Sequence, residues 1–159
     1  MQTRAIPMEE LTELIMLQLE NGGKAKLTVT GVSMMPMLRS RKDVVDLIPV
    51  NGPQKAGEVI LYRRENGQYV LHRIIKVTKD GYICSGDNQA MQEPVAHSQL
   101  LAVMEGFTHN GKTYQRTSWG YRCYTWIWVN LFIFRKPYIA VRRFCSRIRR
   151  KLKRNQKKG

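Results

Sequence analysis

Short apolar-rich stretches bounded by turn residues occupy residues 24–85, and the stretch 24–30 alternates apolar and polar positions as a half-buried β-strand does. Asn66-Gly67 and Asp80-Gly81 separate three of these stretches, and such dipeptides favour tight hairpin turns because both turn positions need a positive φ. The pattern therefore predicts a three-stranded meander preceded by two further strands. The predicted strands are residues 24–30, 44–50, 58–64, 68–78 and 82–85.

Helical spacing of apolar residues appears towards the two ends of the chain. Residues 8–20 repeat with this period, and Asn21-Gly22-Gly23 ends the predicted helix. Seven aromatic residues crowd into residues 119–134, and after Pro137 apolar residues recur at helical spacing among arginines and lysines. This last pattern predicts a basic amphipathic helix. Strands do not alternate with helices, so a parallel nucleotide-binding sheet is not expected.

We therefore expect a mainly β fold with a short N-terminal helix and a C-terminal helical, basic tail. The expected regions are an N-terminal helix and linker over residues 1–24, a β-domain over 25–110, and an aromatic then polybasic tail over 111–159. A length of 159 residues suits one domain with a hydrophobic core. Hydrophobic residues make up 43% of the chain and charged residues 25%, which excludes a wholly disordered chain and a multi-span membrane protein.

The net charge of +15 lies entirely in the last third of the chain. Residues 1–105 hold 12 basic and 12 acidic residues, whereas residues 106–159 hold 15 basic residues and no acidic one. Such asymmetry indicates an anionic partner, either lipid headgroups or nucleic acid. The aromatic residues precede the basic stretch instead of interleaving with it, which favours a lipid surface. A further possibility is that the aromatic residues of 119–134 pack on the β-domain.

No membrane-spanning helix or secretory signal is expected. The longest nearly apolar run, residues 123–134, would cover about 18 Å as a helix, against a hydrocarbon core of roughly 30 Å. We therefore expect peripheral association with an anionic membrane through residues 119–158, at the cytoplasmic face. The three cysteines, Cys84, Cys123 and Cys145, form no metal-binding pair, and we expect neither a metal nor another cofactor.

Two short segments contain residues that could carry out nucleophilic catalysis. Ser33 follows a predicted strand, with Gly31 before it and Pro36 after it, in a bend where a hydroxyl would be exposed and neighbouring N–H groups could form an oxyanion hole. His72 lies in the predicted strand 68–78, and a neutral imidazole can remove the proton of a serine hydroxyl. Each residue also has a simpler interpretation, as a turn serine and as a half-buried structural histidine.

Two carboxylates lie close to these segments in the sequence. Asp87, in the turn after strand 82–85, could orient an imidazole or cap backbone amides, and Glu93 follows six residues later. His97 and His109 are alternative bases, and both are predicted at the surface. Three other serines, Ser40, Ser85 and Ser98, also fall in predicted turns.

Together these segments resemble the ordered boxes of type I signal peptidases, whose catalytic β-fold is shared with the self-cleaving SOS repressor peptidases. The resemblance covers about residues 25–105 and keeps the order of five boxes. Most bacterial members have a lysine where this chain has His72, whereas the endoplasmic-reticulum, archaeal and sporulation-type members have histidine. The five boxes are Gly31–Pro36, Asp43–Val45, Gly57–Ile60, His72–Ile74 and Gly86–Asn88.

The resemblance implies Ser33 as nucleophile, His72 as general base and Asp87 as the acid that orients the imidazole. Histidine-type members often carry a second aspartate six residues after the first, and this chain has Glu93 there. A serine that donates to the oxyanion in some members corresponds to Gly31, which leaves chiefly the Ser33 amide as donor. The resemblance also implies small residues at the first and third positions before the scissile bond.

This chain departs from the family in what precedes the serine. Members that process exported proteins have a transmembrane anchor there, whereas this chain has only the predicted helix 8–20. Either the tail holds the protein at the cytoplasmic face, or the chain is exported by an unrecognised route. Three methionines after Ser33 could form an exposed apolar rim or pack in the core; they are Met34, Met35 and Met37.

The sequence thus predicts a serine endopeptidase that acts on polypeptides at a membrane surface. Two alternatives remain open at this stage. The β-domain could be a degenerate peptidase whose tail binds lipid or nucleic acid, or the chain could be a regulator that cleaves itself. No helix-turn-helix domain fits into residues 1–24, which disfavours the self-cleaving regulator.

Overall fold

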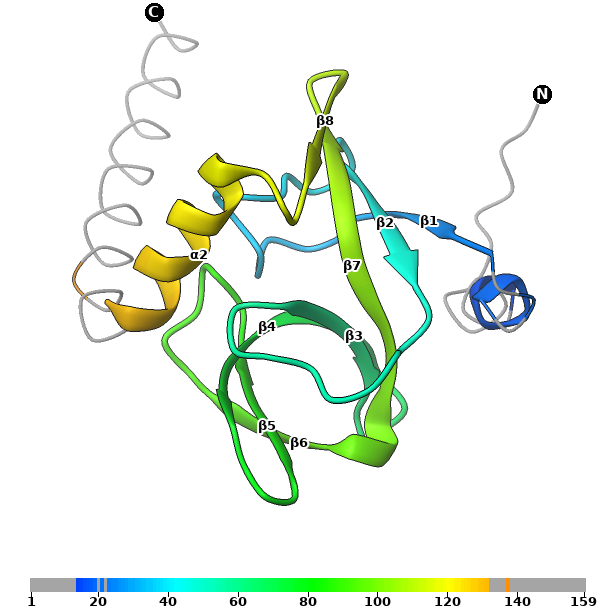
Figure 1. The fold of residues 1–159 in the computed structure, drawn as a ribbon, viewed down its shortest axis with the longest axis vertical. Helices are drawn as coiled ribbons and strands as arrows, with labels where there is room; N and C mark the ends of the chain where they lie inside the picture. The colour runs from blue at the N-terminus through cyan, green and yellow to red at the C-terminus, as the bar shows by residue number, and fades with distance from the viewer. Residues whose placement is uncertain (1–13, 20, 22, 132–136, 138–159) are drawn as a thin grey trace, which may run out of the picture.

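The computed structural model describes residues 14–19, 21, 23–131 and 137, and their fold is mainly β, as the sequence predicts (Figure 1). Eight antiparallel strands form one open, strongly curved sheet in the order β1-β2-β7-β3-β4-β5-β6, with β8 paired to β7. The strands are β1 Ala25–Thr28, β2 Val44–Ile48, β3 Val59–Arg63, β4 Tyr69–Val77, β5 Gly81–Ser85, β6 Glu93–Ala96, β7 Leu100–His109 and β8 Lys112–Gln115.

The predicted meander is confirmed, since β3 pairs with β4 and β4 pairs with β5. The first turn differs from the expected two-residue hairpin, because only Gly67 adopts a positive φ, of 85°. The Arg64 and Gln68 backbones close a three-residue loop, in which the Gly67 N–H donates to the Arg64 carbonyl at 2.9 Å. A glycine in the left-handed conformation at the end of a three-residue loop lets the two strands keep their twist. The Asn-Gly dipeptide therefore predicted the position of the hairpin correctly but not the type of its loop.

The longest strand, β7, was not predicted as a strand, although it lies in the middle of the sheet between β2 and β3. It also pairs with β8 through a hairpin at Asn110 and Gly111, which both have positive φ. The expected domain boundary at residue 110 falls inside this hairpin, so the sheet extends to Gln115.

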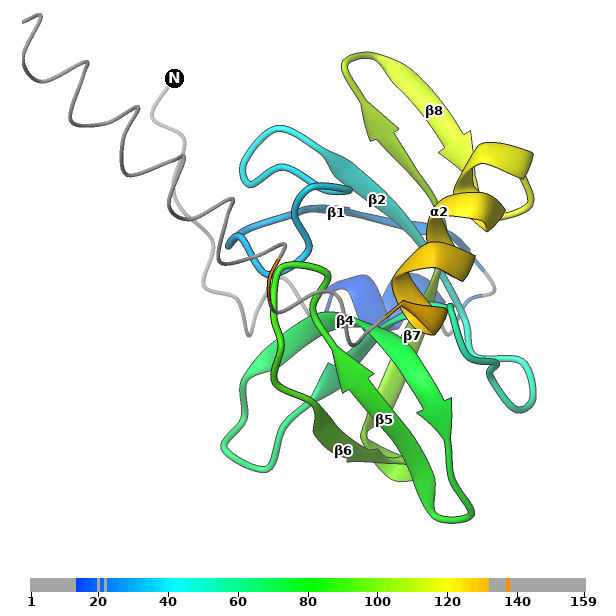
Figure 2. The ribbon, with the colours of Figure 1, turned by 90° about the vertical axis from the view of Figure 1, so that its left-hand side faces the viewer.

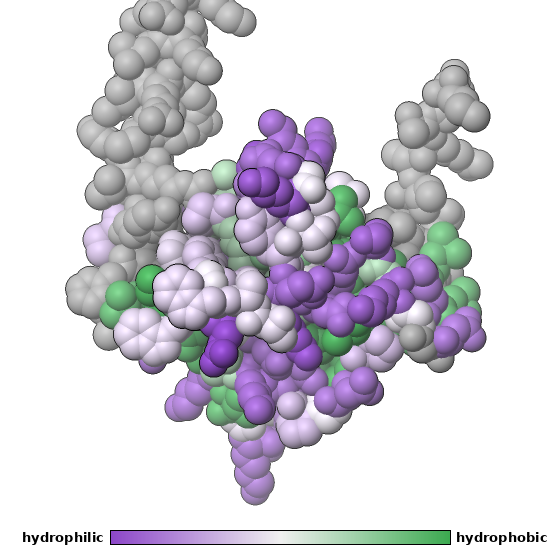
Figure 3. Space-filling view, turned by 45° about the horizontal axis from the view of Figure 1, so that its top comes forward, coloured by the Kyte–Doolittle hydropathy of each residue, from purple (hydrophilic) through white to green (hydrophobic). Residues whose placement is uncertain are grey.

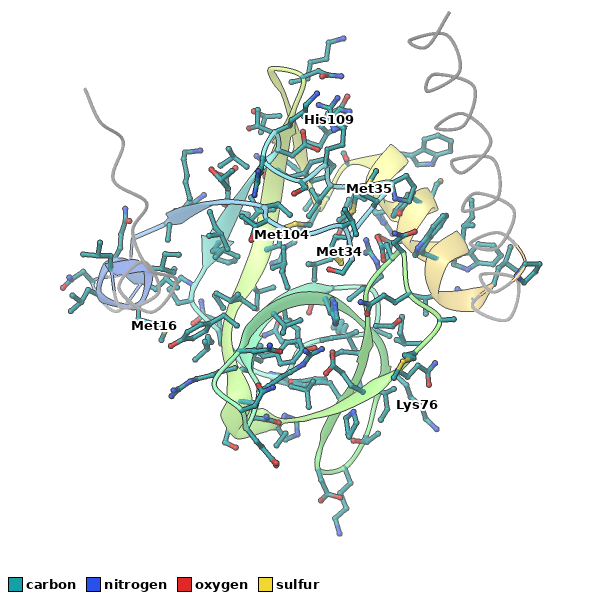
Figure 4. All side chains as sticks on the ribbon, turned by 180° about the vertical axis from the view of Figure 1, so that it is seen from behind. Met16, Met34, Met35, Lys76, Met104 and His109 are labelled. Atoms are coloured by element: carbon teal, nitrogen blue, oxygen red, sulfur yellow. The ribbon has the colours of Figure 1, made fainter. Side chains whose placement is uncertain are left out.

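The core lies between the curved sheet, the loop that follows β1 and the N-terminal helix. Residues 14–19 are helical, as predicted, and Ile15 and Leu19 of this helix are buried in the main core cluster. Met34 and Met104 belong to the same cluster, and both lie in the interior in Figure 4. A second cluster around Ile60 fills the space inside β3, β4, β5 and β6.

The helix α2, Trp119–Asn130, packs beside β4 (Figure 2). Within the described residues, no helix is long and apolar enough to cross a membrane. The predicted basic helix after Pro137 and most of residues 132–159 lie outside the described residues.

Candidate active site

Ser33 lies in the loop between β1 and β2, in a series of turns that the chain enters through Gly31 with a φ of 83°. Two hydrogen bonds hold this loop against the turn after β5. The Asn88 N–H donates to the Ser33 carbonyl at 2.6 Å, and the Asn88 side-chain amide donates to the Val32 carbonyl at 3.1 Å. The adjacent Met34 is buried beneath the loop, so Ser33 is held in place from two sides.

His72 lies on β4, opposite Ile60 of β3, with only 2% of its surface exposed. Its Nδ1 atom lies 2.9 Å from Glu93 Oε1 and 3.1 Å from the Tyr62 hydroxyl. A carboxylate can only accept a hydrogen bond. When the imidazole is neutral, its proton is therefore on Nδ1, and this N–H donates a hydrogen bond to Glu93. The Nε2 atom is then the unprotonated nitrogen of the ring.

Ser33 and His72 converge on Gly86, the first residue of the turn after β5. A Cβ atom placed on Gly86 would lie 3.0 Å from His72 Nε2 and 3.0 Å from Ser33 Cβ. The basic nitrogen of the histidine and the side chain of the serine therefore approach the same point from two directions. Within the described residues, both hydrogen bonds of the His72 ring are at Nδ1, and none joins Nε2 to Ser33 Oγ; such catalytic hydrogen bonds are often long before substrate binds.

Glu93 is the carboxylate that orients the imidazole. It accepts hydrogen bonds from His72, from the Tyr62 hydroxyl and, through two nitrogens at 2.7 and 2.8 Å, from Arg64. Burial alone would raise the pKa of Glu93, but the Arg64 and Tyr62 hydrogen bonds and the Arg64 charge outweigh it and lower that pKa. Glu93 is thus held as an anion beside Nδ1.

Burial is the main influence on the basicity of His72, and it lowers the pKa of the imidazole below 6.5. The charge and hydrogen bond of Glu93 act in the opposite direction, but they do not overcome the burial. His72 is therefore neutral at neutral pH, which is the form that can accept a proton from a hydroxyl.

Asp87, which was expected to orient His72, instead binds Arg73, the next residue on β4. The two carboxylate oxygens accept from Arg73 Nε at 2.9 Å and from Nη2 at 2.8 Å, and both side chains are fully buried. Successive side chains of a strand point to opposite faces, so His72 and Arg73 reach different carboxylates. The sequence spacing suggested that Asp87 orients the imidazole. In the structure, Glu93 is the carboxylate that His72 Nδ1 contacts.

The Arg73–Asp87 pair also fixes α2. Arg73 Nη1 donates to Thr125 Oγ1 at 3.0 Å, the Tyr124 hydroxyl donates to Asp87 at 3.0 Å, and Trp128 Nε1 donates to the Asp87 carbonyl at 3.0 Å. The packing interpretation of the aromatic segment is therefore correct for one face of residues 119–130.

The remaining candidates lie in other surroundings. Met34 and Met37 are buried, so these two methionines belong to the core and not to an exposed rim. His97 is exposed at the start of the 3-10 helix η1, His97–Gln99, against the Tyr82 ring. His109, at the end of β7 (Figure 4), donates from Nδ1 to the buried Asp43 carboxylate at 2.8 Å.

Tyr62 and Arg64 are site residues that the sequence reasoning missed. They lie two positions apart at the end of β3 and its turn, so they point to the same face as each other. The pairing of β3 with β4, which carries His72, was predicted. The register of these two strands is the signal that could have placed Tyr62 and Arg64 near the imidazole.

A small apolar pocket of about 60 Å³ lies between residues that precede Ser33 in the sequence and residues that precede His72, although neither Ser33 nor His72 lines it. One wall is formed by residues 27–30, which lead to Ser33, and the other by Leu61, Tyr69 and Leu71, the last of which adjoins His72. Ile15 of the N-terminal helix also lines the pocket.

The described residues hold no group of three or more metal-ligating side chains. Comparisons with protein-family models, curated proteins and solved structures find no match for this chain.

Proposed function

We propose that the protein is a serine endopeptidase of the signal-peptidase type, in which Ser33 is the nucleophile, His72 the general base and Glu93 the acid that orients the base. One observation carries this proposal. Ser33 and the unprotonated Nε2 of His72 converge on Gly86, while the opposite ring nitrogen is fixed by Glu93.

In the proposed reaction, Nε2 of His72 takes the hydroxyl proton as Ser33 Oγ attacks the carbonyl carbon of the peptide bond. The carbonyl oxygen becomes an oxyanion, and the Ser33 N–H would donate to it. The intermediate collapses as the imidazolium gives its proton to the leaving amine, which leaves an acyl ester on Ser33. A water molecule, deprotonated by the same nitrogen, then hydrolyses the ester.

A polypeptide substrate is supported by the sheet edges that border the small pocket. β1 is the last strand of the sheet on its side, and β5 pairs with β4 only from Arg73 onward. Within the described residues, the backbones of β1 and of Tyr69–Leu71 thus each have one unpaired edge, and an extended peptide can pair with such an edge. A pocket of about 60 Å³ suits a small side chain, as the resemblance implies.

The proposal is tested by cleavage of a peptide library with the full chain, with Ser33→Ala, and with Ser98→Ala as a matched control for an exposed serine away from the site. We expect cleavage after small residues by the full chain and the control variant, and none by Ser33→Ala with an unchanged circular dichroism spectrum. Retained cleavage by a folded Ser33→Ala variant would refute the mechanism. Cleavage after large aromatic or charged residues would remove the likeness to signal peptidases.

A further inference from the structure

The outer face of α2 carries large apolar side chains that the rest of the described protein leaves uncovered. Trp119 is 81% exposed and Trp126 is 62% exposed, and the neighbouring Ile127 is also exposed. The two tryptophans are seven residues apart, which is about two helical turns, so they lie on the same face. The opposite face is held by the contacts of Tyr124, Thr125 and Trp128 described above, so this helix cannot rotate to bury its tryptophans.

A cleft of about 780 Å³ lies beside this face and is rimmed by positive charge. Lys55, Arg116 and Arg122 line it together with Trp126. Glu58 is the acidic residue in its lining, and this carboxylate already accepts from Arg116 at 3.1 Å. The cleft therefore has a net positive charge next to an indole ring.

We propose that this surface, formed by the outer face of α2 and the adjoining cleft, docks onto a bilayer that contains anionic phospholipids. Tryptophan rings suit the headgroup depth of a membrane, where an apolar body and a polar N–H are both accommodated. Lys55, Arg116 and Arg122 would meet lipid phosphates in the cleft. Figure 3 shows the pale side chains of intermediate hydropathy that gather at the left, where α2 lies in Figure 1.

The charge of the chain fits this partner. Residues 106–159 contain 15 basic and no acidic residues, so the sequence on both sides of α2 is complementary to an anionic leaflet. A basic residue held near such a leaflet contributes on the order of 1 kcal/mol. Nucleic acid would also attract this charge, but both exposed indoles lie on one face of a single helix and only Trp126 reaches the basic cleft, which favours lipid.

Docking would bring the candidate active site close to the lipid surface. Tyr124 and Trp128 contact Asp87, and Asp87 adjoins Gly86, where Ser33 and His72 meet. The preferred substrates would then be peptide bonds held near a membrane. This last step rests on the proposed peptidase function, whereas membrane binding itself does not.

The test is co-sedimentation of the full chain with phosphatidylcholine vesicles, with and without phosphatidylglycerol. Three variants are compared: Trp119→Ser with Trp126→Ser, Lys55→Glu with Arg122→Glu, and Met91→Ser. Met91 is a matched control because it is 82% exposed and lies outside the docking surface. We expect binding only with phosphatidylglycerol, a loss of about tenfold or more for both double variants, and no change for Met91→Ser.

Three results would overturn the proposal. They are full binding by both double variants, equal binding to vesicles of phosphatidylcholine alone, and release of the protein from anionic vesicles by duplex DNA that binds it more tightly. Ser33→Ala should bind vesicles as the unchanged chain does, so inactivity of the peptidase and absence of docking are separate outcomes.

Discussion

At the position of Gly86 there is room for a hydrogen atom but not for a side chain. A Cβ there would lie 2.7 Å from the Ser33 carbonyl oxygen, in addition to its contacts with Ser33 Cβ and His72 Nε2. This distance is shorter than any ordinary van der Waals contact, so an added methyl group must push Ser33 and His72 apart. The close approach of two reactive side chains therefore depends on a glycine.

We predict that Gly86→Ala lowers the rate of peptide cleavage by about 100-fold, because misplacement of reacting groups by about 1 Å costs on this order. Steady-state kinetics measure the effect. Gly120→Ala is the matched control, since a Cβ at Gly120 meets nothing within 4 Å. An active Gly86→Ala enzyme would show that Ser33 and His72 do not act together.

A second prediction separates the two carboxylates. Glu93→Gln should lower kcat by about 10²- to 10⁴-fold and keep the fold, because the imidazole loses the anion that fixes its tautomer and stabilises its protonated form. Asp87→Asn should instead lower the free energy of unfolding by about 3–5 kcal/mol, because it leaves the buried Arg73 guanidinium uncompensated. Urea unfolding and kinetics on both variants are the measurements, and a reversed pattern would return the orienting role to Asp87.

The pH dependence of cleavage follows from the burial of His72. Its neutral form is the active base, so activity falls as pH is lowered through the pKa of the imidazole. Because burial lowers this pKa, we predict that the midpoint of the acid limb lies below pH 6.5. Glu93→Gln should move the midpoint to lower pH still, since the Glu93 charge raises the pKa of His72. A rate that rises only above about pH 9 would exclude His72 as the base.

At the scale of secondary structure, the sequence signals succeeded where the chain turns and failed where a strand is buried. Asn66-Gly67 and Asp80-Gly81 marked two hairpins correctly. The strand β7 was not predicted from its pattern of apolar residues. It lies between two other strands, so consecutive residues such as Val103 and Met104 are buried and the pattern has no two-residue period. Packing of the aromatic segment on the β-domain was one of the possibilities that the sequence left open, but its partner could not be foreseen, since Arg73 is a charged strand residue of a kind that is more often solvent-exposed.

The N-terminal helix leads to a prediction about specificity. Ile15 lines the small pocket between residues 27–30 and Leu71 that we propose takes the substrate side chain, so Ile15→Ala should enlarge the pocket and allow larger aliphatic side chains before the scissile bond. The same change should cost about 2–5 kcal/mol of stability, since Ile15 is buried. A peptide-library profile of the variant, recorded at a temperature where it remains folded, tests this. An unchanged preference for small residues would show that this pocket does not bind the substrate.

At the scale of the whole molecule, the sequence indicated Ser33 and His72 because both lie in ordered segments with a recognisable resemblance. It assigned the orienting role to Asp87, whereas the carboxylate bonded to His72 is Glu93, because the pairing depends on which face of β4 each side chain reaches. The charge asymmetry was evident from composition, whereas the surface that would meet an anionic partner required the three-dimensional arrangement of α2, Lys55 and Arg116.

The most direct test of the central claim is the reaction of the full chain with a serine-directed acylating probe, followed by mass spectrometry to locate the label. The account predicts that the label lies on Ser33, that Ser33→Ala abolishes it, and that His72→Ala slows it strongly while the protein stays folded. A folded protein that takes no label, or takes it on another serine at the same rate with and without His72, would contradict the assignment of Ser33 and His72 as nucleophile and base.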